Sequence, residues 1–268
     1  MSYMLEICDI YKAFNIGTIN EKVALNGVSL QLNPGDFVTI IGGNGAGKST
    51  MLNAIAGVWP VDDGKIIIDG VDVTKLSEYK RAKYLGRVFQ DPMNGTAATM
   101  SIEDNMAIAA RRGKRRTLRW GITKEERARY REMLKGLDLG LEDRMSSKVG
   151  LLSGGQRQAI TLLMASLQQP KLLLLDEHTA ALDPKTAQKV LDLSDKIINE
   201  NQLTAMMVTH NMKDAIAHGN RLIMMNEGKI IYDISGEAKK KLQVSDLLAK
   251  FEEASGTEFA NDRMMFAK

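Results

Sequence analysis

The amino-acid sequence indicates an α/β fold on the strength of three features. Residues 37–41 form an apolar, β-branched run that leads into a glycine-rich loop and then a segment free of Gly and Pro, the order of strand, loop and helix. Residues 3–33 have the pattern of antiparallel strands, and residues 91–150 carry helix-capping sequences. We therefore expect a parallel-sheet core, an N-terminal antiparallel β subdomain and an inserted α-helical subdomain.

Composition and length are those of one large globular domain. Of 268 residues, 44% are hydrophobic and 26% are charged, and the single cysteine, Cys8, excludes an intramolecular disulfide. No run approaches the ~20 apolar residues of a membrane span, and the N-terminus lacks the pattern of a signal peptide. We expect a chain that is cytosolic or peripheral on a membrane. The expected parts of the domain are 1–90 (antiparallel β subdomain and first part of the core), 91–150 (helical subdomain), 151–235 (rest of the core) and 236–268 (C-terminal helical tail).

The first ninety residues are expected to be strands around one helix. The strands within 3–33 are separated by a turn-rich centre at 17–20. The elements that follow are the helix 49–56, a hairpin joining 64–69 to 71–73, and a short strand 87–89 that ends at Gln90. Phe14, one of six phenylalanines, could stack on an adenine base or be an ordinary core side chain.

The glycine-rich loop is the most specific motif of the chain. Residues 42–50 read Gly-Gly-Asn-Gly-Ala-Gly-Lys-Ser-Thr and match the phosphate-binding pattern G-x-x-x-x-G-K-[ST]. Glycines let successive backbone N–H groups point at a phosphate, and the helix N-terminus adds partial positive charge. Lys48 is expected to reach the β- and γ-phosphates, and Ser49 to ligate Mg²⁺. The residues predicted to hold the nucleotide here are Gly42, Asn44, Gly45, Ala46, Gly47, Lys48, Ser49 and Thr50.

The second half of the chain alternates helices with strands. Ser101 and Thr123 begin the two capped helices of the insert. The later elements are expected to be helix 156–168, the leucine-rich buried strand 171–176, a helix from 183, strand 204–209, helix 211–218, a hairpin around 227–228 and helix 244–251, with weak order beyond residue 255.

Polar side chains follow three of the expected strands. Gln90, the pair Asp176-Glu177, and His210 each stand where a strand ends. Because the carboxyl ends of strands in an open α/β sheet meet at the ligand crevice, all four side chains should face the phosphates. Asp176 is placed to hold Mg²⁺, and Glu177 to accept a proton from the attacking water or to orient it.

A second anion-binding device lies outside the glycine loop. The turn Ser153-Gly154-Gly155-Gln156 precedes a strong helix, whose N-terminus attracts anions. One chain binds one γ-phosphate, yet it has two such devices. We therefore expect a two-fold dimer in which the second device of each chain closes over the nucleotide of the other.

These motifs together resemble those of the nucleotide-binding subunit of an ABC transporter, over residues 3 to about 235. The resemblance implies the ABC ATPase fold, with ATP and Mg²⁺ as cofactors. Phe14 then matches the aromatic residue that stacks on adenine, 42–50 the Walker A loop, 152–156 the signature loop and 181–183 the D-loop. The implied site residues are Lys48, Gln90, Glu177 and His210 for catalysis, Ser153, Gly154, Gly155, Gln156 and Asp183 for the nucleotide, and Ser49, Gln90 and Asp176 for the metal.

The resemblance also implies partners. These are a second, identical nucleotide-binding subunit, integral membrane permease subunits at the cytoplasmic face of the membrane and, indirectly, an extracytoplasmic solute-binding protein, with no nucleic acid. Residues 176–183 and 207–212 are similar to those of a bacterial importer subgroup linked to binding lipoproteins for aromatic amino acids. Two alternatives stay open: an exporter ATPase for lipoprotein, peptide or drug, and a soluble ABC ATPase without a transport role.

Two features depart from the common pattern. His178 stands where the family commonly has Pro, and it is either a neutral variant or a residue that tunes Glu177. The net charge of +3 is unevenly spread, since six of the nine positions 111–119 are basic. This stretch either contacts anionic lipid or an acidic permease loop, or it is a solvated helix end. Its basic residues are Arg111, Arg112, Lys114, Arg115, Arg116 and Arg119.

Overall fold

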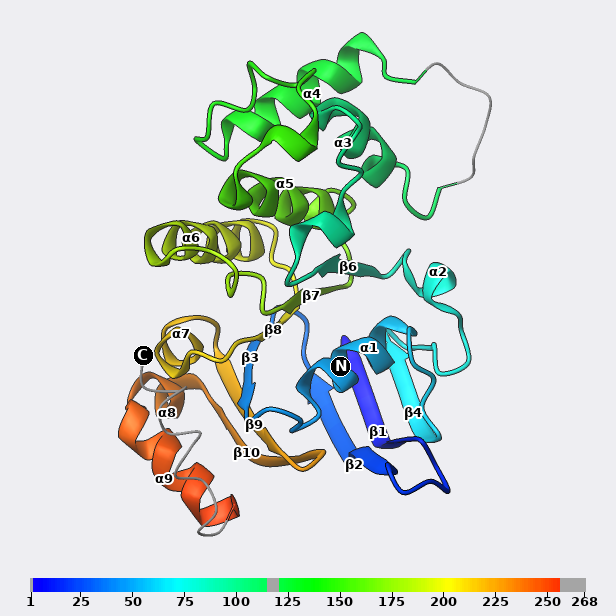
Figure 1. Cartoon of the computed structure of the whole chain (residues 1–268), viewed down its shortest axis with the longest axis vertical. Coiled ribbons are helices and arrows are strands. Elements are labelled where there is room, and N and C mark those ends of the chain that lie inside the picture. Colours follow the sequence, from blue (N-terminus) through cyan, green and yellow to red (C-terminus); the bar gives the residue numbers. More distant parts are fainter. Residues whose placement is uncertain (1, 115–120, 256–268) are drawn as a thin grey trace.

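A computed structural model describes residues 2–114 and 121–255, and it has the predicted α/β fold (Figure 1). Within these ranges one sheet has six strands in the order β10-β9-β3-β8-β7-β6, and the other has four in the order β2-β1-β4-β5. The strands are β1 (Leu5–Phe14), β2 (Lys22–Leu32), β3 (Phe37–Gly42), β4 (Asp63–Ile68), β5 (Val71–Asp72), β6 (Leu85–Val88), β7 (Leu172–Asp176), β8 (Ala205–Val208), β9 (Arg221–Asn226) and β10 (Lys229–Ser235).

The helices lie between and after these strands. They are α1 (Lys48–Ala56), α2 (Glu78–Arg81), α3 (Ile102–Ala110), α4 (Lys124–Lys135), α5 (Gly154–Ser166), α6 (Pro184–Glu200), α7 (Met212–Ala217), α8 (Gly236–Lys240) and α9 (Val244–Ser255), with the 3-10 turns η1 (Pro92–Gly95) and η2 (Val149–Leu151). Among the helices so described, none has the length and apolarity that crossing a bilayer requires.

The six-stranded sheet is parallel from β9 to β6, and only β10 runs antiparallel to its neighbour. Its central strand β3 is buried at every position, as expected of a strand covered on both faces. On one face α1 packs in a core that it shares with the four-stranded sheet. On the other face lie α5 and α6, and beside them α7 and α9. Helices packed on both faces of the sheet thus fix the positions of its strand ends.

The insert forms a helical layer with its own core, in the upper part of Figure 1. Tyr130 and Leu134 of α4 and Met106 of α3 pack against α5, and all three are fully or almost fully buried. Both predicted caps are present: Ser101 and Thr123 each form a capping box with the acidic residue three positions later. The start of α5 differs from the prediction. Ser153 is its N-cap, so the helix begins at Gly154, two residues before the expected Gln156.

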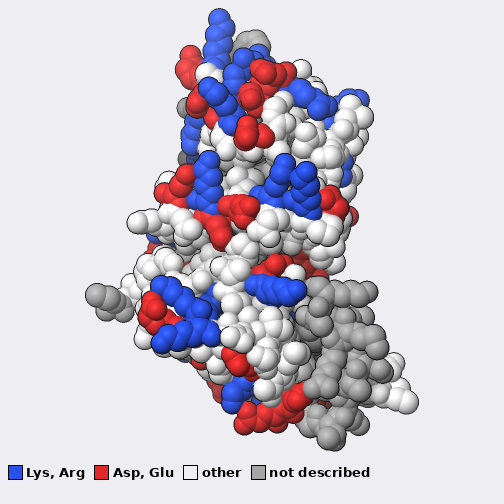
Figure 2. Space-filling model, turned by 90° about the vertical axis from the view of Figure 1, so that its left-hand side faces the viewer, with Lys and Arg blue, Asp and Glu red and all other residues white. Residues whose placement is uncertain are grey.

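Two of the three described basic residues of the stretch 111–119 make side-chain contacts within the chain, and the third, Lys114, is exposed. Arg111 donates to the carbonyl of Ala107 at 2.8 Å, and Arg112 donates to the carbonyl of Ala165 at 3.0 Å. These two side chains therefore have structural partners, whereas Arg115, Arg116 and Arg119 lie outside the described residues, as does the tail beyond 255. Figure 2 shows that on one face of the molecule basic and acidic side chains lie intermixed, without a continuous field of one sign.

Candidate nucleotide-binding and catalytic site

The topology brings the predicted strand-end residues to one edge of the sheet. β6, β7, β8 and β3 are parallel neighbours, so their carboxyl ends point the same way. Asp176 is the last residue of β7 and pairs in register with Val208, the last of β8. Gln90 and His210 each follow their strand by two residues. The convergence predicted from the sequence is thus a consequence of the parallel order.

Glycine is required in the loop at positions where backbone and space both exclude a side chain. Gly47 has a φ of 101°, and a Cβ there would lie 2.5 Å from the carbonyl oxygen of Ala24. Gly42 has a φ of 151°, and its Cβ would clash with the carbonyl of Met225. Asn44 and Gly45 lie exposed at the tip, whereas Ala46 is buried. The loop is therefore clasped between β2 and the end of β9, with only its tip open to solvent.

Lys48 and Ser49 begin α1 directly below this loop. The Lys48 ammonium donates to the carbonyl oxygens of Gly42 at 2.8 Å and Gly43 at 2.9 Å, so the side chain curls back under the loop. The Ser49 hydroxyl donates to a carboxylate oxygen of Asp176 at 3.3 Å. Thr50 is the next residue of α1. The structure thus brings the cation, the hydroxyl and the carboxylate of the two predicted motifs together.

Asp176 is flanked by a basic side chain that the sequence did not single out. The Arg87 guanidinium lies 3.9 Å from the Asp176 carboxylate and donates to Asn53 of α1 at 2.6 Å. Its Cζ atom lies over the Phe89 ring, 4.5 Å from the ring centroid. Burial and the neighbouring Glu177 raise the pKa of Asp176, while Arg87 and Ser49 oppose that rise. An arginine within a short buried strand was the signal that could have revealed this contact.

The donor set at Asp176 fits a magnesium ion. Among the described residues there is no group of three or more His, Cys, Asp or Glu that could hold a metal. Mg²⁺ needs no such cage, because it is commonly held by one or two protein oxygens together with water and substrate phosphates. The Ser49 hydroxyl and the Asp176 carboxylate, in direct contact, are oxygen ligands of this kind.

Glu177 and His210 form a close pair. The His210 Nε2 lies 2.6 Å from the Glu177 carboxylate. Glu177 has a φ of 46°, in the left-handed region that residues with a side chain rarely adopt. Burial opposes the charge of Glu177, but the hydrogen bond and charge of His210, with the charge of Lys48, lower its pKa below the ordinary value. Glu177 is therefore kept as a carboxylate, the form that accepts a proton.

The signature turn is a helix N-terminus that lies apart from this cluster. The Ser153 hydroxyl accepts from the Gln156 amide at 3.3 Å, and the Gln156 side chain accepts from the Ser153 amide at 3.2 Å. Ser153 and Gly154 are exposed, while Gly155 is buried where a Cβ would clash with Thr186. α5 lies in the upper half of Figure 1 and α1 in the lower half. The chain itself does not bring the two anion-binding devices together.

Phe14 and Asp183 occupy defined places near the ends of elements. Phe14 ends β1, and its ring meets that of Trp59 edge to face with centroids 5.0 Å apart. The Lys12 ammonium lies 5.6 Å from the same ring. Asp183 is the N-cap of α6 and accepts from the Thr186 amide at 3.1 Å. The Phe14 ring is half-buried, so it is not an ordinary core side chain.

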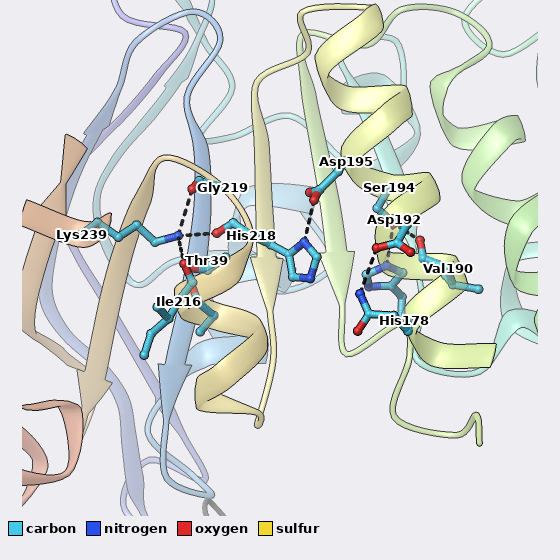
Figure 3. A network of polar contacts seen from close by, with 12 residues as sticks. Thr39, His178, Val190, Asp192, Ser194, Asp195, Ile216, His218, Gly219 and Lys239 are labelled. Atoms are coloured by element: carbon cyan, nitrogen blue, oxygen red, sulfur yellow. Dashed lines mark hydrogen bonds and ion pairs between the residues drawn. The ribbon is translucent and has the colours of Figure 1, made fainter. Parts of the chain in front are cut away.

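His178, the residue after Glu177, is buried in the interior. The residue is 2% exposed, and its Nε2 lies 2.9 Å from the Ser194 hydroxyl of α6 (Figure 3). Burial, with the nearby charge of His218, lowers the pKa of His178 to about 4, so the ring is neutral. The substitution relative to the common Pro thus introduces a buried polar contact.

The fold and the loop define a nucleotide-binding ATPase with an inserted helical layer. A family model described as "ABC transporter" matches residues 25–180, and the chain belongs to that family. It is therefore an ATPase of the ABC class.

Similar proteins come from transport systems. The chain is 43% identical over 251 residues to a tyrosine transport ATP-binding protein of Clostridioides difficile, covering 94% of this chain and 100% of that one. It is 35% identical to a methionine import ATP-binding protein, MetN, of Corynebacterium diphtheriae, covering 85% of this chain but only 64% of that protein.

The fold is shared with solved cassettes. The dimeric cassette MJ0796, in a post-hydrolysis state bound to ADP and phosphate, has a TM-score of 0.74 at 30% identity, covering 87% of this chain and 98% of that one. The protein cbiO1 of Clostridium perfringens, part of the ABC transporter complex cbiONQ, has a TM-score of 0.74 at 25% identity, covering 99% and 98%.

Proposed function

We propose that this chain is the ATP-hydrolysing subunit of an ABC importer for a small solute, of the chemical class of tyrosine. The observation that carries the ATP-hydrolysing part of the proposal is the cluster of Lys48, Ser49, Asp176, Glu177 and His210 at one edge of the sheet. The 43% sequence identity to the tyrosine transport ATP-binding protein, which extends over the whole length of that protein, supports the solute class.

In this proposal each residue of the cluster has one task. The backbone amides of 42–50 and the Lys48 ammonium bind the β- and γ-phosphates, and Phe14 stacks on the adenine. Ser49, Asp176 and Gln90 hold Mg²⁺, which supplies neutralising charge to the phosphates when it is bound. Glu177 accepts the proton of the attacking water, and His210 orients the Glu177 carboxylate through their short contact.

The second anion-binding device acts on a second copy of the chain. Ser153 and Gly154 are exposed at the N-terminus of α5, where they are available to a nucleotide outside the chain. A two-fold dimer would place Ser153, Gly154, Gly155 and Gln156 over the γ-phosphate of the partner, with Asp183 at the interface. ATP binding closes this dimer, and hydrolysis reopens it. The dimeric state of the similar cassette MJ0796 supports this arrangement.

The proposed partners are two integral membrane permease subunits and an extracytoplasmic binding protein, which place the chain at the cytoplasmic face of the membrane. The relative cbiO1 is part of a multi-subunit transporter complex, which supports a membrane partner. The proposal includes no nucleic-acid partner.

Detergent pull-down of the tagged chain from its native membrane tests this proposal. We expect a permease and a binding lipoprotein to come down with it, and the lipoprotein to bind tyrosine or a related amino acid in calorimetry. Recovery of a permease whose vesicles expel solute would favour the exporter alternative. Recovery of soluble proteins alone would contradict the transport role and leave the ATPase class intact.

A further inference from the structure

The sequence has three histidines, of which His210 belongs to the Glu177–His210 pair and the other two follow the residues of that pair in the chain. His210 contacts Glu177 directly. His178 is the residue after Glu177, and His218 is the C-cap of α7, the helix that begins two residues after His210. The two segments that carry the pair are therefore each followed by a histidine.

One turn of α6 holds both of these histidines. The Ser194 hydroxyl lies 2.9 Å from Nε2 of His178, and the Asp195 carboxylate lies 2.6 Å from Nδ1 of His218. The Ser194 hydroxyl already donates to the carbonyl of Val190 at 2.8 Å, so it accepts from the Nε2–H of His178. Figure 3 shows His178 and His218 reaching α6 from two different segments.

The C-terminal end of α7, which His218 already connects to Asp195, also contacts α8. The Lys239 ammonium, on a side chain that is 2% exposed, donates to the carbonyl oxygens of Ile216 and Gly219 at 3.2 and 2.9 Å, and also to that of His218. A cation at these carbonyls satisfies the open end of the helix. α7 is a single short helix between His210 and His218. Contacts that fix its C-terminal end therefore also restrict the movement of His210 before its N-terminus.

The catalytic pair needs such support. Glu177 has a left-handed φ of 46°, a conformation that persists in a residue with a side chain only when its surroundings impose it. The buried hydrogen bond of the next residue, His178, is a constraint of this kind. His210 is 38% exposed at its side chain, so packing alone does not fix its ring.

We propose that Ser194 and Asp195 of α6 are positioning residues for the Glu177–His210 pair, acting through His178 and His218. The catalytic roles of Glu177 and His210 are those of the proposed function, on which this inference rests. Through these contacts α6 holds the segment after β7 and the end of α7, which are distant in sequence, in fixed positions relative to each other. His178 then contributes to the geometry of the site.

Imidazole NMR tests the positioning directly, because three histidines give three resolvable spin systems. We would record long-range ¹H–¹⁵N spectra of wild type, Ser194→Ala and Asp195→Asn, each without nucleotide. The His210 signals are expected to move in both variants, although neither residue contacts His210 in the described structure. The matched controls are Ser166→Ala, another buried helix serine that donates to a carbonyl of its own helix, and Glu200→Gln, an exposed carboxylate on α6.

Kinetics give the second readout. In Ser194→Ala and Asp195→Asn we expect kcat for ATP to fall about tenfold while KM changes less than about twofold, since misplacement of a catalytic group affects chemistry rather than binding. Ser194→Ala in a His178→Phe background should add no further loss, because the partner is already absent. Thermal unfolding of every variant separates these effects from a general loss of fold.

The outcomes are distinct. Unmoved His210 signals in both variants, with wild-type kcat, would overturn the positioning role. An additive loss in the His178→Phe background would overturn the assigned route through His178. If the wild-type chain does not hydrolyse ATP, the proposed function fails, and the His210 spectra still decide whether α6 positions the pair.

Discussion

The His210 ring lies 2.6 Å from the carboxylate of Glu177, and these residues come from the ends of two neighbouring parallel strands. Glu177 is the proposed proton acceptor, and the His210 ring is close enough to hold its carboxylate in one orientation. The contact lies within a single chain, so forming the pair does not require a dimer.

Removing the His210 ring should impair chemistry while sparing nucleotide binding. His210→Ala leaves Glu177 without its orienting contact, and we expect kcat to fall about 100-fold, as for loss of a positioned acid–base group. Binding of a fluorescent ATP analogue should stay within about twofold of wild type. A variant that loses binding and keeps kcat would contradict the assignment of His210 to the catalytic step.

The loop glycines should differ from turn glycines in their tolerance of a methyl group. Gly47→Ala places a Cβ 2.5 Å from the Ala24 carbonyl at a φ of 101°, and we expect a loss of about 1–3 kcal/mol of unfolding free energy. Gly70, at a φ of 74° with nothing within 4 Å of its Cβ, is the matched control for backbone strain alone. Denaturant unfolding of both alanine variants measures the difference, and equal losses would contradict the role of the close approach.

Arg87 should influence metal affinity. Its guanidinium lies 3.9 Å from Asp176 and is anchored on Asn53, so Arg87→Met would leave the carboxylate without that cation. We expect the Mg²⁺ concentration needed for half-maximal ATPase activity to rise about tenfold, the usual cost of losing an outer partner of a metal ligand. Arg87→Lys should recover part of this loss. An unchanged Mg²⁺ requirement in both variants would contradict the role assigned to Arg87.

The His218–Asp195 contact should make stability depend on pH. The hydrogen bond that His218 donates to the Asp195 carboxylate raises the pKa of His218 above its ordinary value of 6.5. Burial opposes this rise, and the charges of Asp195, Asp214 and Asp192 add to it. The contact therefore contributes stability that is fully present below about pH 6.5 and is lost as pH rises through the folded pKa.

Chemical unfolding of wild type and Asp195→Asn across this range measures that contribution. We expect the gap in unfolding free energy between them to be larger at low pH and to shrink as the pH rises. The same series in a His218→Gln background should show no such trend. A gap that widens with pH would contradict the assignment.

The sequence was sufficient for the parallel core and for most of the cluster. The positions of Asp176 and His210 follow from strand order, because polar residues at the ends of parallel strands must share an edge. The sequence predicts a start of α5 that is two residues late, because Gly154 and Gly155 are poor helix formers although they form the first turn that Ser153 caps.

The contacts of Arg87 and of Ser194 with His178 could not be predicted. They join residues distant in sequence, with no spacing or periodicity to mark them. The signature turn at Ser153 is predictable from its sequence, but its contact with a nucleotide is not present in one chain, because the proposed γ-phosphate is bound by another copy.

The central claim is that two copies close over ATP and that Glu177 is needed to reopen them. Its most direct test is the solution mass of Glu177→Gln with ATP and Mg²⁺, measured by light scattering during gel filtration. We predict a stable dimer in this variant, and a monomer once Lys48→Ala is added to prevent nucleotide binding. A Glu177→Gln chain that binds ATP and stays monomeric would contradict the claim.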